Sequence, residues 1–454
     1  MRVGLFIFPV RFSSLMPIDI AYLAAYLKKH NHEVYARDFN CELSVRKDSD
    51  TWYWDNEEMQ RGLFIQQNEL VTQWVNDIVA FDPDVVGIST WTAQTFFSLS
   101  IARLIKERCP KTLVVIGGPQ VALSSASCMQ STFVDYSVLG EGEITLREIV
   151  ESQARDDPIP GTKHRIGNVV IDGGMREQIQ DLDSLPFPDY SSFDFIKYLY
   201  PHYPILFNRG CTWLCSFCSL RLNWRNFYSR SAENIFAEIK DCATRYPSIQ
   251  SFYSCDHSMN ANIALLYRLC NLLIDDGTKR DFFGFGQVLN GMLDDDFLDK
   301  LAKAGFRDWG IGLQSGSDRI LRSMKRPYTT ALAERVFQAM NKRGMKIYTD
   351  FINGYPEETE EDFQQTLKFI SRIRKYVDNI TIHPVCFLGN NDLASNPKKY
   401  GIRVFENSTE WESEFNNPEI RKRRYKELID HVSSLGICVR LPNSDREHFS
   451  KSQE

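Results

Sequence analysis

Three cysteines stand within eight residues of this sequence, in the string NRGCTWLCSFCS. Three residues separate Cys211 from Cys215, and two separate Cys215 from Cys218. One loop with this spacing can direct three thiolates at a single metal centre, and thiolates are the protein ligands of iron–sulfur cubanes. Because a four-iron cube with three protein ligands leaves one iron open, the pattern favours a cluster that binds a further molecule at that iron.

Structural zinc and a redox-active cysteine pair are the alternatives to a cluster. A closed zinc site needs a fourth protein ligand, and His202, Cys242 or Cys255 could supply it, although none has a familiar finger spacing. Two thiols close in sequence could also undergo disulfide exchange. The other eight of the eleven cysteines are scattered singly, which is typical of small buried side chains.

The cysteine string resembles the radical S-adenosylmethionine (SAM) superfamily, in which Cys-x3-Cys-x2-Cys follows a barrel strand and an aromatic residue, here Phe217, precedes the last cysteine. The resemblance implies that Cys211, Cys215 and Cys218 hold a [4Fe-4S] cluster whose open iron chelates SAM. It also implies reductive cleavage of SAM to a 5′-deoxyadenosyl radical, with electrons from a partner such as flavodoxin or ferredoxin.

Three later segments resemble the SAM-binding positions of that family, in the same order along the chain. FYSCDHS resembles the region that meets the methionine amine, WGIGLQSGSD the ribose-binding segment, and DFINGYPEE the glycine motif that meets adenine. Family members usually have glutamate where this chain has Gln314, whose amide can still hydrogen-bond ribose hydroxyls. With Phe217, the candidate SAM-binding residues are Tyr253, Asp256, Gln314, Ser315, Gly354 and Pro356.

Alternating strand and helix patterns surround these motifs between residues 201 and 395, the expected radical SAM core. The expected strands lie at 205–208, 251–255, 282–287, 309–313, 346–351 and 380–385. Six strand–helix units predict a partial (β/α)6 barrel of the TIM type, since the closed form has eight. The motifs then fall at the carboxyl ends of the strands, where such folds place their chemistry.

Residues 1–150 predict a separate α/β domain, doubly wound and Rossmann-like. Short apolar runs at 2–8, 33–37, 85–89, 113–116 and 136–139 alternate with helical patterns, which indicates a parallel sheet. Ligands of such sheets bind at the carboxyl ends of the strands, where this chain carries glycines and hydroxyl side chains but no GxGxxG. The candidate ligand-binding residues are Ser89, Thr90, Gly117, Gly118, Gly140, Glu141 and Gly142.

The series PIDIAYLAAYLKKHNHEV, DPDVVGIST, VVIGGP and GEGE resembles the cobalamin-binding domain that precedes many radical SAM enzymes. The resemblance implies that cobalamin binds to residues 1–150; a degenerate domain that serves only in packing is the alternative. Many cobalamin domains carry Asp-x-His-x-x-Gly after the first strand, whereas this chain has PVRFSSLMP. His30 and His32 precede the second strand and are expected at the opposite edge of the sheet.

The rest of the chain and its composition indicate what kinds of partner to expect. Residues 151–200 are expected to form a connector with a small hairpin, and 396–454 a small C-terminal element whose basic RKRRYKELID helix is solvated. The net charge of −6 gives no reason to expect nucleic acid, and no stretch reaches the ~18 apolar residues of a membrane helix. Since the amino terminus does not resemble a signal peptide, the chain is expected to be cytoplasmic.

These features together predict a radical SAM enzyme that uses cobalamin to methylate an unactivated carbon of a small molecule or peptide, such as a natural-product or cofactor intermediate. A cyclase or other rearrangement enzyme would use the same parts. An RNA methylthiotransferase is a third interpretation, but it calls for a second three-cysteine site, and Cys41, Cys109 and Cys128 are widely dispersed.

Overall fold

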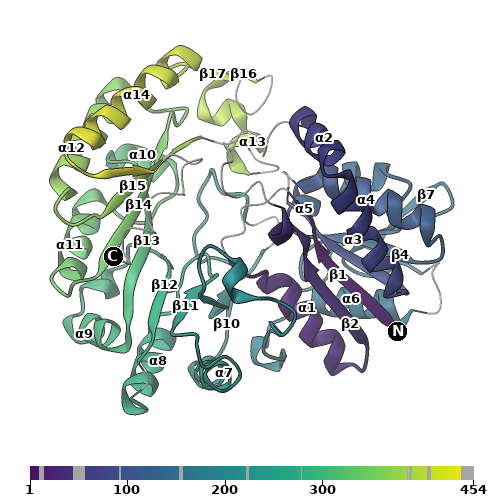
Figure 1. The fold of residues 1–454 in the computed structure, drawn as a ribbon. Coiled ribbons are helices and arrows are strands. Elements are labelled where there is room, and N and C mark those ends of the chain that lie inside the picture. The colour runs from purple at the N-terminus through teal and green to yellow at the C-terminus, as the bar shows by residue number, and fades with distance from the viewer. Residues whose placement is uncertain are drawn as a thin grey trace. The chain divides into compact units, whose positions relative to one another are not determined.

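The computed structural model describes residues 1–9, 15–43, 57–91, 94–152, 157–220, 224–277, 279–385, 387, 391–405 and 411–440. The chain divides into two units. The first comprises Met1–Pro204 with Leu222–Arg225, and the second Ile205–Arg221 with Asn226–Glu454. Figure 1 shows a parallel sheet flanked by helices in each of them.

The first unit is built on a seven-stranded sheet in the order β2-β1-β3-β4-β5-β6-β7. Its parallel strands are β1 (Arg2–Ile7), β2 (Glu33–Asp38), β3 (Val85–Ser89), β4 (Leu113–Gly117) and β5 (Tyr136–Val138). These are the five strands that the sequence predicts. The antiparallel strands β6 (Thr162–Ile166) and β7 (Val169–Asp172) form the expected hairpin, which joins the same sheet.

Helices cover both faces of this sheet, as a doubly wound fold requires. On one face, Phe6, Ile88 and Val114 share a hydrophobic core with buried side chains of three helices, α2 (Glu57–Gln66), α3 (Asn68–Ala80) and α4 (Thr95–Arg108). The helix α5 (Pro119–Gln130) packs on the same side of β4 through Val121, beside Ile116. The other face is covered by α1 (Ile18–Lys29) and α6 (Gly142–Glu151).

The second unit contains a seven-stranded sheet in the order β18-β15-β14-β13-β12-β11-β8. Its strands are β8 (Tyr203–Ile205), β11 (Ser251–Ser254), β12 (Asp281–Gly286), β13 (Phe306–Gln314), β14 (Lys346–Asn353), β15 (Asn379–Pro384) and β18 (Cys438–Arg440). The strands from β11 to β15 are parallel to their neighbours. The predicted series of barrel strands is therefore confirmed.

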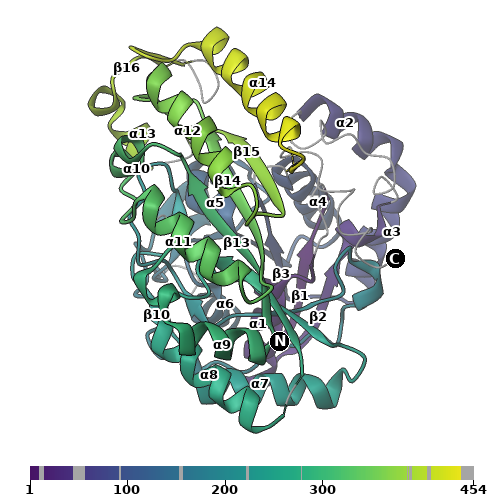
Figure 2. The same ribbon diagram turned by 90° about the vertical axis from the view of Figure 1, so that its left-hand side faces the viewer.

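Helices run along the outer side of this second sheet (Figure 2). They are α7 (Ala232–Arg245), α8 (Ile263–Asp275), α9 (Asp295–Ala304), α11 (Thr330–Asn341) and α12 (Glu360–Ile373). Side-chain caps fix where most of them begin, as in the capping box of Thr359 and Asp362 at α12. The helices leave the carboxyl ends of the strands free for the loops that carry the motifs.

The carboxyl-terminal part of the chain differs from the expected solvated element. The helix α14 (Pro418–Ser434) packs on α12, and β18 pairs in parallel with β15. Arg424, Leu428 and Val432 are buried along one stripe of α14. Their spacing of four residues forms a buried face inside a basic run, so the high charge of the segment concealed its packing surface.

Candidate functional site

The cysteine loop leaves a short strand pair in the second unit. The strand β9 (Asn208–Arg209) pairs with β10 (Tyr228–Ser229), and Gly210 follows with a φ of 91°. A Cβ on Gly210 would lie 2.2 Å from the carbonyl oxygen of Asn226, so only glycine fits this turn. The turn directs the loop over the carboxyl ends of the strands.

All three cysteines line one cavity of about 240 Å³ at those carboxyl ends. Of the other residues that the sequence singles out in this unit, Phe217, Asp256 and Gln314 line the same cavity. The candidate SAM-binding residues that do not line it are Tyr253, Ser315, Gly354 and Pro356, and the alternative zinc ligands Cys242 and Cys255 do not line it either. Thus the structure brings part of the predicted set together around the thiols.

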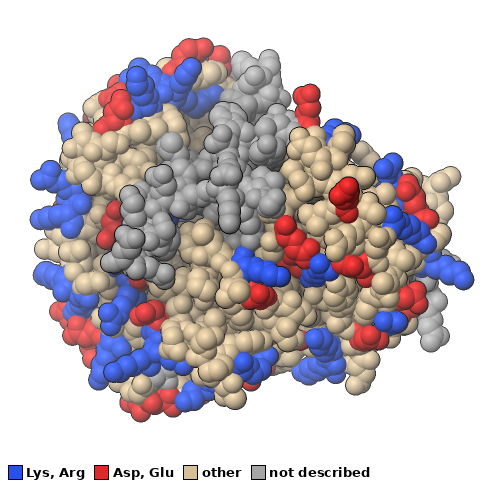
Figure 3. Space-filling model, in the orientation of Figure 1, with Lys and Arg blue, Asp and Glu red and all other residues tan. Residues whose placement is uncertain are grey.

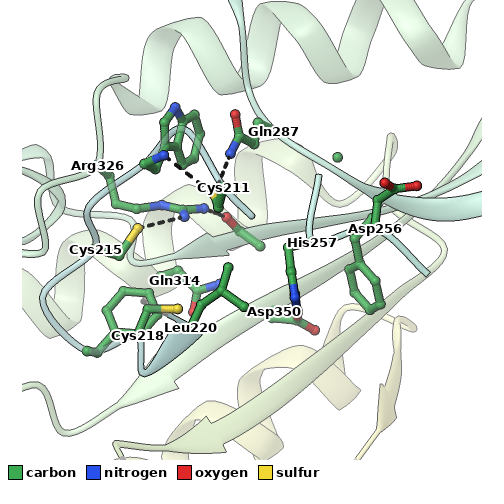
Figure 4. A pocket seen from close by; sticks show the side chains of 15 residues that line it. Cys211, Cys215, Cys218, Leu220, Asp256, His257, Gln287, Gln314, Arg326 and Asp350 are labelled. Carbon is green, nitrogen blue, oxygen red and sulfur yellow. Dashed lines mark hydrogen bonds between the residues drawn. The ribbon is translucent and has the colours of Figure 1, made fainter. Parts of the chain in front are cut away.

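Two side chains outside the predicted set donate hydrogen bonds to the thiols (Figure 4). Gln287 Nε2 lies 3.2 Å from Cys211 Sγ, and Arg326 Nη1 lies 3.3 Å from Cys215 Sγ. The Arg326 guanidinium also stacks over the Trp213 ring at 4.4 Å. Gln287 is the last residue of the expected third strand, so position at a strand end was the available signal for it, whereas Arg326 follows α10 (Asp318–Ser323) and no motif marked it.

The donor chemistry of this cavity fits an iron–sulfur cluster. Burial raises the pKa of the Cys211 and Cys218 thiols, so thiolates here need positive charge or hydrogen-bond donors nearby. Arg326 supplies both, and its buried Nε has no hydrogen-bond partner within the part of the chain that the structure describes. In that same part, no group of three or more His, Cys, Asp or Glu is already gathered closely enough to hold a metal ion.

Gln314 stands at the end of β13 in a strained backbone conformation. Its φ is 73°, which side-chain-bearing residues adopt rarely, and the pairing of β13 with β14 shifts register at this point. A Cβ on Gly312 would lie 2.2 Å from Gln314 Nε2, so Gly312 makes room for that amide. Asp350 pairs with Gly312 across the two strands and lines the same cavity.

Asp256 lines the cavity, but its carboxylate is engaged behind the cysteine loop. It accepts hydrogen bonds from the backbone N–H of Phe207 at 3.0 Å and of Asn208 at 2.6 Å, and from the Ser254 hydroxyl. Burial raises the pKa of Asp256 to about 7. The carboxylate thus holds the segment that leads into the loop, and its expected contact with the methionine amine stays a prediction.

In the first unit, the predicted polar residues are engaged within the fold. Ser89 Oγ donates to Asp19 Oδ2 at 2.6 Å. The Thr90 hydroxyl accepts from Ser98 Oγ at 3.1 Å, and a Glu141 carboxylate oxygen accepts from a backbone N–H at 2.6 Å. These side chains therefore shape the carboxyl edge of the sheet through contacts inside the unit.

Bare backbone remains at the ends of β4 and β5. A Cβ on Gly117 would meet nothing closer than 3.9 Å, and the same holds at Gly140. At Gly118, by contrast, φ is 95° and a Cβ would lie 2.7 Å from the Thr90 carbonyl oxygen. An edge with open glycine backbone fits a large flat ligand such as a corrinoid. His30 and His32 precede β2, at the other end of the strands.

Two family models match the chain. The radical SAM superfamily matches residues 205–370, and the B12 binding domain matches residues 10–150. The first match begins at β8 and includes the cysteine loop, and the second includes β3, β4 and β5 with the hydroxyl-bearing residues and glycines at their carboxyl ends.

Individual relatives and solved structures agree with these matches. An uncharacterized methyltransferase of Pyrococcus horikoshii is 26% identical, covering 65% of this chain and 66% of the relative. The anaerobic magnesium-protoporphyrin IX monomethyl ester cyclase of Rubrivivax gelatinosus is 25% identical, covering 66% of this chain and 56% of the relative. The radical SAM methyltransferase TsrM of Kitasatospora setae has the same fold, with a TM-score of 0.72 at 16% identity over 98% of this chain and 92% of that one.

The chain spans only about 56–66% of the length of these two curated relatives. The two domain matches nevertheless fall on the two units in the predicted order. Together they identify a [4Fe-4S] cluster, SAM and cobalamin as the cofactors. The chain therefore belongs to the radical SAM enzymes that carry a B12-binding domain ahead of the radical SAM domain.

Proposed function

We propose that this protein is a methyltransferase that acts on an unactivated carbon of a small molecule or peptide, such as a natural-product or cofactor intermediate. The observation that carries the proposal is a single cavity lined by three thiols, by the two side chains that donate to them and by the polar side chains of Gln314 and Asp350. A B12-binding domain on the same chain adds a group that carries methyl.

Cys211, Cys215 and Cys218 would hold the cluster, and cobalamin would lie along the edge formed by Ser89, Gly117, Gly118 and Gly140. When bound, the cluster with SAM supplies a radical that removes a hydrogen atom from the substrate, and cobalamin supplies the methyl group. Such a reaction suits a carbon that no general base could deprotonate.

The chain's own residues bind and orient within the cavity. The positive charge of the Arg326 side chain, which lines the cavity, suits a carboxylate such as that of the methionine end of SAM. Gln314 and Asp350, on adjacent strands, offer acceptors for a pair of ribose hydroxyls. Trp213, Phe217 and Phe285 supply apolar wall that excludes water from a reactive radical.

A labelled-methyl assay tests the proposal. With a candidate substrate and SAM, we expect S-adenosylhomocysteine and 5′-deoxyadenosine in near-equal amounts per methylated product, because one SAM restores the methyl donor while another is cleaved. S-adenosylhomocysteine alone would mean polar methyl transfer without a substrate radical.

A rearrangement such as ring closure is the second candidate, and the similarity to the Rubrivivax gelatinosus cyclase favours it. Product with 5′-deoxyadenosine but without S-adenosylhomocysteine would select it. An RNA methylthiotransferase is disfavoured, because Cys41, Cys109 and Cys128 lie on η1 (Phe39–Glu42), after α4 and within α5, which are separate elements.

The proposal includes a cytoplasmic location and an electron-donating partner, since the cluster must be reduced before each cleavage. Among the helices of the described residues, none combines the length and the apolar character that a membrane crossing needs. Lys and Arg side chains are interspersed with Asp and Glu on the face drawn in Figure 3. This mixture, with the net charge of −6, supports a partner other than nucleic acid.

A further inference from the structure

The hydroxyl of Tyr355 joins three segments of the second unit. Tyr355 follows β14 and is fully buried. Its hydroxyl oxygen lies 2.9 Å from Ser216 Oγ and 3.2 Å from Ser323 Oγ, and it donates to the Ser323 carbonyl oxygen at 3.2 Å. Ser323 ends the helix α10 (Asp318–Ser323) after the Gln314 segment, whereas Ser216 belongs to the cysteine loop.

Ser216 is the anchored point of that loop. It stands between Cys215 and Phe217 and is fully buried. Its backbone N–H donates to the Met324 carbonyl at 3.1 Å, and its carbonyl accepts from the Leu393 N–H at 3.1 Å. With the Tyr355 hydroxyl on its side chain, Ser216 is held from three directions, so the loop is fixed in its middle.

Phe217 extends this anchoring on the side of Cys218. Its ring packs against the hydrophobic cluster that contains Tyr355 and Leu393. Its carbonyl oxygen accepts from Asn391 Nδ2 at 3.0 Å. Two consecutive residues between Cys215 and Cys218 are thus tied to elements far away in the sequence, and the sulfur positions depend on those ties.

The carboxyl-terminal segment holds Tyr355 in turn. Asn416 Nδ2 donates to the Tyr355 carbonyl at 2.8 Å and to the Glu358 carbonyl at 3.2 Å. Arg424 Nη1 donates to Asn416 Oδ1 at 3.1 Å and to the Glu358 carbonyl at 3.0 Å. The side chains of Arg424 and Glu358 are each only 3% exposed, so this support lies in the interior, where an ion pair or hydrogen bond is poorly replaced by water.

We propose that Tyr355 is a positioning residue for the cluster, linking the loop after β14 to Ser216 between the cluster ligands. The expected adenine-binding loop and the cluster loop then move together, and the segment from Trp411 to Arg424 stabilises both. The inference rests on the assignment of Cys211, Cys215 and Cys218 as ligands under the proposed function. It does not depend on which reaction follows.

The test compares full-length Tyr355→Phe, Ser216→Ala and the double variant after anaerobic reconstitution. The rate of iron release to a chelator should rise about three- to tenfold in each single variant, because each removes the buried hydrogen bond between Tyr355 and Ser216, and no further in the double variant. The electron paramagnetic resonance signal of the reduced cluster with SAM should broaden in all three. Ser323→Ala, which keeps the Ser216 contact, should stay within about twofold of the wild type.

The proposal would be overturned if the increases in iron-release rate of the two single variants multiplied in the double variant. It would also be overturned if Tyr355→Phe released iron at the wild-type rate and gave the wild-type spectrum. Circular dichroism of each variant separates local loosening from unfolding, and Ser216→Ala tests the same bond from its other end. If the wild type retained its cluster but transferred no methyl group, the proposed function would fail while these iron-release results still decided the role of Tyr355.

A matched pair of arginines tests the support from α14. Arg423 and Arg424 both contact Glu360, but the Arg423 side chain is 52% exposed whereas that of Arg424 is 3% exposed. Arg424→Met should raise iron release at least as much as Tyr355→Phe, and Arg423→Met should not raise it. Arg424→Lys should restore part of the loss. Equal rates of iron release in Arg424→Met and Arg423→Met would contradict the proposed support of Tyr355 by α14.

Discussion

The two sheets of this chain carry different kinds of residue at the carboxyl ends of their strands. In the second unit, Gln287 follows β12, Gln314 ends β13 and Asp350 lies within β14, and their side chains line a cavity beside three thiols. In the first unit, Ser89 and Thr90 at the end of β3 bond within the fold, and Gly117 leaves open backbone at the end of β4.

The difference follows from what each edge has to hold. A cluster is bound through bonds to sulfur, so its site depends on side chains that are present and held in place. A corrinoid presents a broad surface, so its site depends on glycine positions, where no side chain blocks its approach to the backbone. Removing a side chain should therefore damage the second unit's site, and adding one should damage the first unit's site.

The largest effect is expected from removing a thiol. Cys218→Ala should lower the iron content from about four per chain to below about one, because the cube loses a ligand. Cys270→Ala is the matched control: Cys270 is fully buried in α8, so its loss should cost about 1 kcal/mol of stability and no iron. Iron analysis after anaerobic reconstitution measures both variants. A full iron content in Cys218→Ala would contradict the assignment of Cys218 as a cluster ligand.

Adding a methyl group to the first sheet should have the next largest effect. Gly118→Ala forces φ of 95° and a contact of 2.7 Å on an alanine, so urea unfolding should show a loss of roughly 1–3 kcal/mol. Gly117→Ala meets nothing within 3.9 Å, so stability should change by less than about 0.5 kcal/mol while retained cobalamin falls.

Absorbance of the corrinoid after desalting measures how much cobalamin each variant retains. If Gly117→Ala kept as much cobalamin as the wild type, the open backbone at β4 would not be the binding surface. If Gly118→Ala were as stable as the wild type, the inference that this turn requires glycine would be wrong.

The two sites also differed in how far the sequence could predict them. Cys211, Cys215 and Cys218 stand in one short string, and the apolar periodicity predicted the sheets that carry both edges. Gln287 and Arg326 act through single contacts to sulfur, which no local pattern marks. Position at the end of a predicted strand was the only available signal for Gln287.

Long-range contacts lay beyond the reach of sequence patterns for a related reason. Ser216 and Tyr355 are 139 residues apart, and their hydroxyls meet only because β14 and the cysteine loop end at the same edge. Arg424 is buried in a basic helix, where charge normally predicts exposure. Its burial depends on Glu358 and Asn416, which helix periodicity does not reveal.

A smaller effect is expected from a donor to sulfur. Gln287→Leu removes the hydrogen bond to Cys211 Sγ, which stabilises the more electron-rich reduced cluster, so the reduction potential should fall by roughly 20–60 mV. Thr212 Oγ1 donates to Gln287 Oε1 at 3.4 Å, so Thr212→Val should shift the potential in the same direction but less. Potentiometric titration followed by electron paramagnetic resonance checks both, and a rise in either variant would contradict the role of Gln287.

The smallest effect concerns pH and the carboxyl group behind the cysteine loop. Burial raises the pKa of Asp256 to about 7, above the ordinary value near 4, so between these values the folded state holds a proton that the unfolded state has lost. Stability should therefore fall as pH rises from 4 to 7, by less than ~1.4 kcal/mol per pH unit from this group. Asp256→Asn should make the urea midpoint of the apoprotein less dependent on pH between 5 and 7.

Glu360→Gln is the control, because the hydrogen bond from Arg423 lowers the pKa of Glu360 to about 2. That group gives up its proton below pH 5 in both the folded and the unfolded state, so its removal should leave the slope between pH 5 and 7 unchanged. Hydrogen exchange of peptides from β13 assigns the midpoint to the second unit. An unchanged slope in Asp256→Asn would mean that Asp256 stays ionised, with its hydrogen bonds from Phe207 and Asn208 outweighing its burial.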